Sequence, residues 1–82
     1  MYEDFTLAEL AQVIQNDWKK VYFGAKPYLE AMFSLQNIDQ NYYADTGSSV
    51  VAYFLANAQN WRGNIAREVK KELNKRLKAS YK

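Results

Sequence analysis

The side chains best suited to binding a charged ligand are the lysines and arginines near the end of the chain. Six of them are Arg62, Arg67, Lys70, Lys71, Lys75 and Lys78. On a helical wheel that starts at Trp61, all of these except Arg62 fall between about 180° and 320°. Such a cationic stripe can neutralise phosphates, so polyanion binding is one hypothesis. A solvated helix surface is the alternative, since Glu68 and Glu72 interrupt the stripe.

Two arginines of the same segment fall elsewhere on the wheel. Arg62 and Arg76 lie at about 100° and 60°, within the apolar arc. A planar guanidinium there can stack on a ring or pair with a carboxylate such as Asp17 or Asp45. We expect this structural pairing rather than a ligand site, because buried arginines are usually compensated within the fold.

The tyrosines are the second group of candidate binding residues. The chain has seven, and Tyr42 and Tyr43 are adjacent within a polar stretch. A tyrosine ring can pack against apolar atoms while its hydroxyl stays in water. Tyr42 and Tyr43 can therefore form an interface for another protein or for a second copy of this chain. The favoured interpretation is that the tyrosines cover the core of a small domain.

The composition argues against most catalytic chemistry. The chain contains no cysteine and no histidine, which excludes disulfides, thiolate or imidazole metal sites, and nucleophile pairs of the Ser-His or Cys-His type. The carboxylates show no metal-site spacing, and the three glycines form no phosphate-binding loop. We expect no enzymatic activity, no cofactor and no metal.

The chain also shows no membrane or secretory pattern. Its first residues, MYEDFTLAEL, are acidic where a signal peptide is basic, and no run approaches 18 apolar residues. The expectation is a cytoplasmic protein without a membrane partner.

The candidate cations would lie on one side of a helix. The spacing of apolar residues predicts this helix from Asn60 to Lys82. Apolar residues recur along its other side at helical spacing, and the Asn60 side chain can cap its first turn. Residues 61–82 hold eight Lys and Arg and two acids, a net charge of +6, whereas residues 1–60 hold three lysines and seven acids, a net charge of −4. The basic helix can therefore dock on its own acidic body as well as on a polyanion.

Three further helices are predicted upstream, at residues 7–19, 27–35 and 47–58. Thr6 and Glu9 form the pattern of a capping box before the first of them. Gly24 can close this helix in a left-handed conformation, and Pro27 suits the first turn of the next.

The connection at residues 34–47 is the most polar interior stretch. Ile38 is one of its anchors, and we predict a tethered loop with at most one helical turn. Asp45 or Thr46 can cap the helix that follows. The Val50-Val51 pair also fits a strand, but no second convincing strand is present to pair with it, which favours a helix.

These elements predict an all-α fold, a compact bundle of about four helices with the last one long and basic, in a single domain of residues 1–82. The predicted core consists of Leu10, Ile14, Trp18, Leu29, Met32, Phe33, Val51, Phe54, Leu55, Trp61, Ile65, Val69 and Leu73. The last two helices also fit a helix-turn-helix, but Trp61 and Gly63 occupy the turn where base-reading polar residues are expected.

Two parts of the chain resemble small uncharacterised proteins encoded by marine bacteriophages. The parts are DTGSSVVAYFLANAQNWRG (Asp45 to Gly63) with IAREVKKEL after it, and the earlier stretch DWKKVYFGAKPYLEAM. The resemblance spans about Asp17 to Lys78 and implies expression inside an infected bacterium. It assigns no catalytic or binding residue.

The sequence therefore favours a non-enzymatic helical protein of unknown function that binds another protein or itself. Nucleic-acid binding through the basic last helix is the alternative. A salt-dependent affinity for DNA or RNA would favour that alternative, and self-association would favour the first hypothesis.

Overall fold

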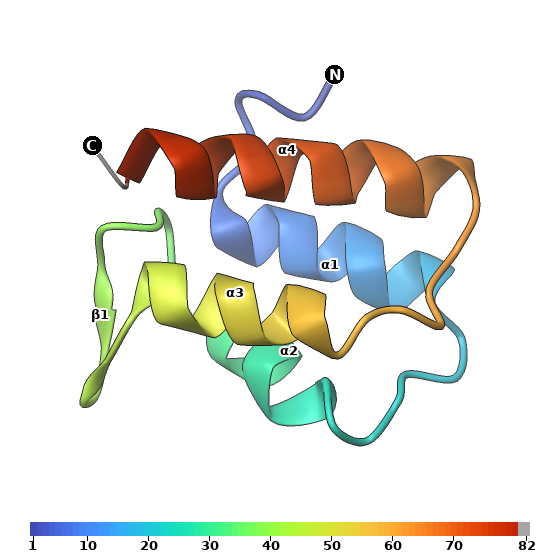
Figure 1. The fold of residues 1–82 in the computed structure, drawn as a ribbon, viewed down its shortest axis with the longest axis horizontal. Coiled ribbons are helices and arrows are strands. Elements are labelled where there is room, and N and C mark those ends of the chain that lie inside the picture. The colour runs from blue at the N-terminus through green and yellow to red at the C-terminus, as the bar shows by residue number, and fades with distance from the viewer. Residues whose placement is uncertain (81–82) are drawn as a thin grey trace.

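The computed structural model describes residues 1–80, and in it the chain is mostly helical (Figure 1). The helices are α1 (Leu7–Asp17), α2 (Lys26–Met32), α3 (Gly47–Ala56) and α4 (Asn64–Ser80). Two short strands, β1 (Asn41–Tyr42) and β2 (Asp45–Thr46), pair as an antiparallel hairpin. The mainly helical fold is confirmed, and the all-α class holds only in part because of this hairpin.

The start of α1 is set by a reciprocal cap. The backbone N–H of Glu9 donates to the Thr6 hydroxyl at 3.0 Å, and the N–H of Thr6 donates to the Glu9 carboxylate at 2.8 Å. This confirms the predicted capping box. The helix ends at Asp17, because Trp18 is already extended. The predicted left-handed closure by Gly24 is wrong, since Gly63 is the glycine with a positive φ among the described residues.

The start of α4 differs from the prediction. The helix begins at Asn64, and its first backbone bond runs from the Arg67 N–H to the Gly63 carbonyl. Asn60 is therefore not its N-cap, and Arg62 is an exposed residue ahead of the helix rather than part of its apolar side. Trp61 is buried before the helix starts. The predicted end at Lys82 lies outside the described residues.

The loop ahead of α3 is anchored much as predicted. Ile38 is buried, and Thr46, not Asp45, caps the helix by accepting from the Ser49 N–H at 3.1 Å. The predicted helices at 27–35 and 47–58 are both shorter, ending at Met32 and Ala56.

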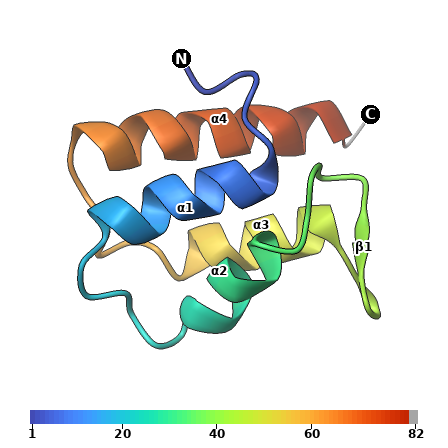
Figure 2. The same ribbon diagram turned by 180° about the vertical axis from the view of Figure 1, so that it is seen from behind.

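The helices touch in a closed order, α1 against α2, α2 against α3, α3 against α4, and α4 against α1. Figure 1 shows α4 along one edge and α2 at the opposite edge, and Figure 2 shows the same arrangement from behind. The hairpin stands at the start of α3. The molecule therefore has a half built by α1 and α4 and a half built by α2, α3 and the hairpin.

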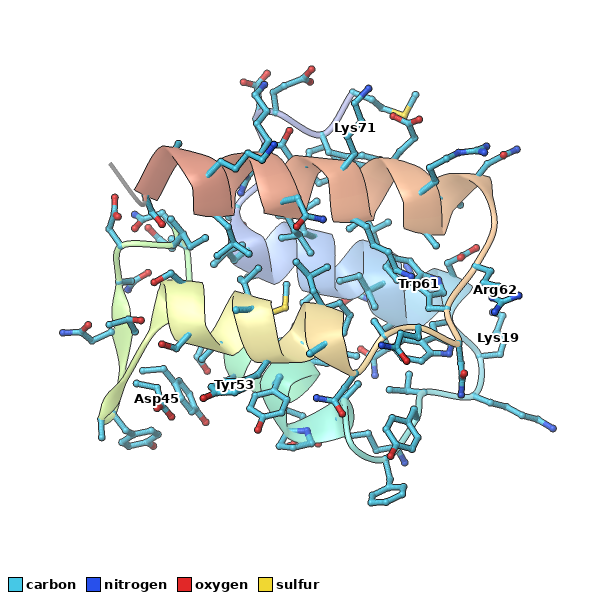
Figure 3. All side chains as sticks on the ribbon, viewed as in Figure 1. Lys19, Asp45, Tyr53, Trp61, Arg62 and Lys71 are labelled. Carbon is cyan, nitrogen blue, oxygen red and sulfur yellow. The ribbon has the colours of Figure 1, made fainter. Side chains whose placement is uncertain are left out.

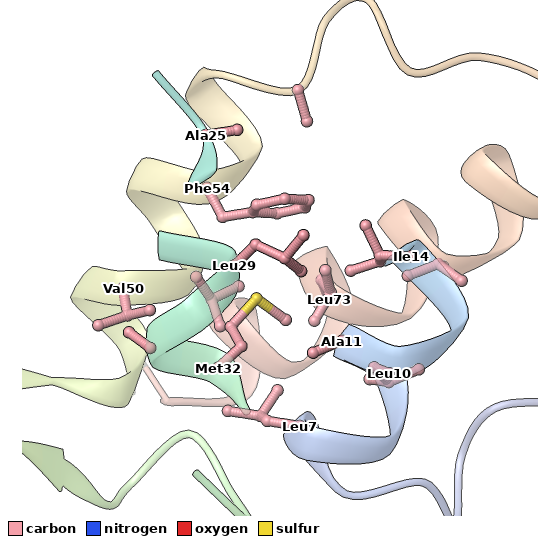
Figure 4. Packing of buried hydrophobic residues seen from close by; sticks show 14 of the residues in the cluster. Leu7, Leu10, Ala11, Ile14, Ala25, Leu29, Met32, Val50, Phe54 and Leu73 are labelled. Atoms are coloured by element: carbon pink, nitrogen blue, oxygen red, sulfur yellow. The ribbon is translucent and has the colours of Figure 1, made fainter. Parts of the chain in front are cut away.

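The space between the helices is filled by one apolar cluster. It takes buried residues from all four helices, including Leu10 and Ile14 of α1, Met32 of α2 and Leu73 of α4 (Figure 4). Each such side chain contributes about 1.5–3 kcal/mol by leaving water. Three predicted core residues are not buried: Phe33 and Leu55 are half-buried, and Ile65 is exposed.

Candidate interaction surfaces

The six candidate polyanion-binding residues do not form one surface. Arg67, Lys71, Lys75 and Lys78 are exposed on α4, and Arg62 is exposed just before it. Figure 3 places Lys71 on the side of α4 away from the other helices, and Arg62 near Trp61 at the right of the view, below the start of α4. Lys70 is the exception, because it is half-buried.

Lys70 points at the backbone that joins α3 to α4. Its ammonium donates to the carbonyls of Ala58 at 2.8 Å and Trp61 at 2.6 Å, and it lies 5.8 Å from the centroid of the Trp61 ring. Burial, and then repulsion by the Arg62 cation, lower the pKa of Lys70. Lys70 therefore stabilises the connection. It also lines a hollow of about 380 Å³ with Arg62 and Arg67, and its polyanion role stays a prediction.

The exposed lysines of α4 have two different surroundings. Lys71 and Lys75 line one hollow of about 230 Å³ together with the carboxylates of Glu3, Glu68 and Glu72. The two lysines also line a hollow of about 520 Å³ with Asn74 and Lys78, and no carboxylate lines it. An anion is therefore better placed at the Lys78 side of the helix than at the Glu68 side.

The charge of Arg76 is compensated within the fold, as expected, but its partners are Glu72 and backbone carbonyls rather than Asp17 or Asp45. Its Nε donates to Glu72 at 2.7 Å, and its Nη2 donates to the carbonyls of Phe5 at 2.7 Å and Tyr2 at 3.1 Å. The side chains of Arg76 and Glu72 are 17% and 12% exposed, so this ion pair is largely shielded from water. Arg76 therefore ties the N-terminal segment to α4.

An aromatic cluster occupies the turn before α4. The rings of Trp18 and Trp61 stack with centroids 5.9 Å apart, and Phe54 meets Trp18 edge-on. The Trp61 indole N–H donates to Asp17 at 2.8 Å, which satisfies its polar atom. This cluster is interior, so it stabilises the fold and offers no surface to a partner.

The two predicted interface tyrosines are placed differently. Tyr43 is 89% exposed and has a φ of 55°, a left-handed conformation that is uncommon for a tyrosine. Tyr42 is half-buried, and its ring meets that of Tyr43 edge-on at 4.7 Å. Tyr43 is therefore the member of the pair that is available to a partner, and its interface role stays a prediction.

Among residues 1–80, three further aromatic residues are exposed: Tyr22 and Tyr53, which belong to the candidate tyrosines, and Phe23, which sequence reasoning did not single out. Phe23 is 75% exposed, Tyr53 is 56% exposed, and Tyr22 is 40% exposed. Tyr53 also stacks on the half-buried Tyr28 of α2 at 5.4 Å.

These residues lie on one half of the molecule. We use the name aromatic face for Tyr22, Phe23, Tyr28, Tyr43 and Tyr53, which come from α2, α3 and the loops beside them. Figure 3 shows the Tyr53 ring and the hairpin residue Asp45 on the side remote from α4. Asn57 connects Tyr53 to Tyr22, because it donates to the Tyr53 carbonyl and lies with Tyr22 around the Gly24 backbone.

A hollow of about 230 Å³ lies beside α2. Its apolar lining is Val21, Leu29 and Phe33, and Lys26 and Glu30 line it with charge. Both charged residues are exposed, and neither forms an ion pair within residues 1–80. The outer surface of α2 therefore carries two opposite charges, one turn apart, next to an apolar recess.

No family model, curated protein or solved structure matches this chain. Its own geometry is therefore what indicates which surfaces could bind a partner. No helix of the described residues is long and apolar enough to cross a membrane. Within residues 1–80, no three carboxylates gather as a metal site.

Proposed function

We propose that this chain is a protein-binding module that contacts its partner through the aromatic face. The observation that carries this proposal is that exposed rings recur along α2, α3 and the loops beside them, in the pairs Tyr22–Phe23, Tyr28–Tyr53 and Tyr42–Tyr43. Six large hydrophobic side chains are exposed among residues 1–80, and four of these belong to residues 22–53. Aromatic residues supply much of the binding energy in protein interfaces, because each buries a large area with few rotatable bonds.

The other half of the molecule supports the same choice. Its outer surface is α4, which presents lysines and arginines with interspersed carboxylates. The lysines and glutamates among them are of the types depleted from protein interfaces, whereas aromatic residues are enriched there. The aromatic face is therefore the better candidate for a protein contact.

Selection of peptides from a random displayed library tests this proposal. Peptides selected on the wild type should lose binding to a Phe23→Ser/Tyr53→Ser variant by at least about tenfold, because two interface anchors are removed. Ile65→Ser is the matched control, since Ile65 is an exposed apolar residue on α4. Peptides that bind both variants equally, or a selection that yields none, would contradict the proposal.

Nucleic-acid binding through α4 is the second candidate. It is favoured by the hollow around Lys75 and Lys78, which no carboxylate lines. Fluorescence anisotropy with a labelled oligonucleotide should then show affinity that falls as salt is added, and a Lys75→Glu/Lys78→Glu variant should weaken it on all sequences alike. Lys19→Glu/Lys20→Glu changes the net charge equally at exposed sites off α4. Equal losses in both variants, or no binding at low salt, would remove this candidate.

We further propose that the protein is not an enzyme and acts in the cytoplasm, within an infected bacterium if the phage resemblance is correct. The absence of cysteine and histidine supports the first part. Finding the protein in the membrane or secreted fraction of its cell would contradict the second.

A further inference from the structure

We propose that the partner is a second copy of this chain, bound so that α2 of each protomer lies antiparallel to α2 of the other across a twofold axis. This inference rests on the proposed protein-binding function and names the partner. Its basis is that the outer surface of α2 is complementary to itself in that one arrangement.

The charges on α2 define the register. Lys26 and Glu30 are both exposed and lie one helical turn apart. Within one helix, lysine preceding glutamate by four residues is the less favourable order for an ion pair, and none is formed here. In an antiparallel pair centred between them, Lys26 faces the partner's Glu30 and Glu30 faces the partner's Lys26. Two ion pairs then form from one surface, as a twofold interface requires.

The same register matches an exposed ring to the recess. Phe23 lies three residues before Lys26, in the turn ahead of α2, and Phe33 lies three residues after Glu30, at the C-cap of α2. In this register they stand at reciprocal ends of the contact, and we propose that each Phe23 meets the partner's Phe33. Phe23 is 75% exposed, and Phe33 lines the hollow beside α2 together with Val21 and Leu29. Each protomer therefore offers one aromatic side chain and one apolar recess at reciprocal positions. A ring that fills such a recess leaves water and gains an aromatic neighbour.

The expected dimer is small. The helix α2 has seven residues, so its contact with the flanking loops lies at the low end of interface sizes, under about 1,200 Å² in total. We therefore expect an equilibrium between monomer and dimer that depends on protein concentration.

Charge exchange tests the register directly. Sedimentation equilibrium up to about 1 mM should show a wild-type dimer, and Lys26→Glu or Glu30→Lys alone should weaken it at least about tenfold, because like charges then face each other. Mixing these two variants should restore association as a heterodimer, since each supplies the charge that the other lacks. The double variant Lys26→Glu/Glu30→Lys should recover self-association. Both sites are exposed, and circular dichroism checks that helicity is kept.

A second measurement uses the unaltered chain. In a mixture of isotope-labelled and unlabelled wild type, filtered nuclear Overhauser spectra should connect the Phe23 ring of one copy to Phe33 of the other. Phe23→Ser should weaken the dimer, whereas Ile65→Ser should leave it unchanged.

A wild type that stays monomeric to about 1 mM overturns the inference. So does a dimer that is indifferent to both charge changes, or one without the Phe23 to Phe33 signal. The proposed function is judged separately, because the Lys26→Glu variant keeps every residue of the aromatic face. Peptide binding by a wild type that stays monomeric would preserve the function and reject the second copy as partner.

Discussion

Arg76 shows how one side chain can fasten a segment that has no secondary structure. Its guanidinium reaches the carbonyls of Tyr2 and Phe5 while it pairs with Glu72. We predict that Arg76→Ala lowers the free energy of unfolding by about 2–3 kcal/mol, because charge-assisted hydrogen bonds are lost and a shielded carboxylate is left unpaired. Urea denaturation measures this loss. Lys75→Ala, one residue away and exposed, should change stability by less than about 0.5 kcal/mol. An equal effect of the two changes would contradict the role of Arg76.

The second prediction concerns the effect of Arg62 on the pKa of Lys70. The pKa of Lys70 is lowered from its ordinary 10.5, first by burial and then by the Arg62 cation. Arg62→Gln should therefore raise the pKa of Lys70, as read from the titration of its Cε carbon signal by NMR. Arg67→Gln, which removes a cation that does not shift Lys70, should leave it unchanged. A Lys70 pKa that is the same in wild type and Arg62→Gln would contradict the repulsion.

The sign of the stability effect follows from the same shift. A folded pKa below the unfolded one means that the unfolded chain holds this proton more tightly. The contribution of Lys70 to the free energy of unfolding therefore increases as pH rises from its folded pKa towards 10.5. In Arg62→Gln, where the folded pKa is closer to the unfolded one, this increase should be smaller.

At the scale of the elements, Gly47 determines how the loop before α3 meets the helix. Its N–H donates to the Gln40 carbonyl at 2.6 Å, and a Cβ at this position would lie 2.7 Å from the Ile38 carbonyl oxygen. Because backbone atoms cannot move aside as a flexible side chain does, we predict that Gly47→Ala costs about 1–3 kcal/mol. Chemical denaturation measures the cost. Ser48→Ala is the neighbouring control and should cost less than about 1 kcal/mol. If Gly47→Ala left the free energy of unfolding unchanged, the loop would have room for a Cβ at this position, and the close packing inferred here would be wrong.

The elements that local signals specify were predictable, and those that depend on distant contacts were not. Thr6 and Thr46 cap α1 and α3 because a hydroxyl at the right offset is enough. The predicted start of α4 was wrong because Trp61 stacks on Trp18 and donates to Asp17, two residues that are far away in sequence. Burying that indole removes residues 61–63 from the helix, and periodicity carries no information on such a contact.

The candidate site was predictable to a similar extent. Tyr43 lies in a polar loop and is exposed, and the lysines of α4 lie on one side of a clear helical pattern. The inward turn of Lys70 depends on carbonyls of another segment, so no wheel could show it. Phe23 was missed because a ring in a short turn carries no periodic signal. Its exposure depends on how the turn between α1 and α2 is placed.

At the scale of the whole molecule, the four helices share one core, and this determines how the protein should unfold. The apolar cluster contains residues from every helix, and α1 contacts α4 to close the arrangement. Neither half can keep its buried surface if the other is lost, so we predict a single cooperative transition. Far-UV circular dichroism reports the helices, and tryptophan fluorescence reports Trp18 and Trp61, which are buried directly after α1 and shortly before α4 in the chain. The two probes should give the same midpoint in urea. Tyrosine absorbance, which also follows Tyr28 and Tyr53 of the other half, should coincide with them. An earlier transition in the tyrosine signal would show that the α2–α3 half opens alone.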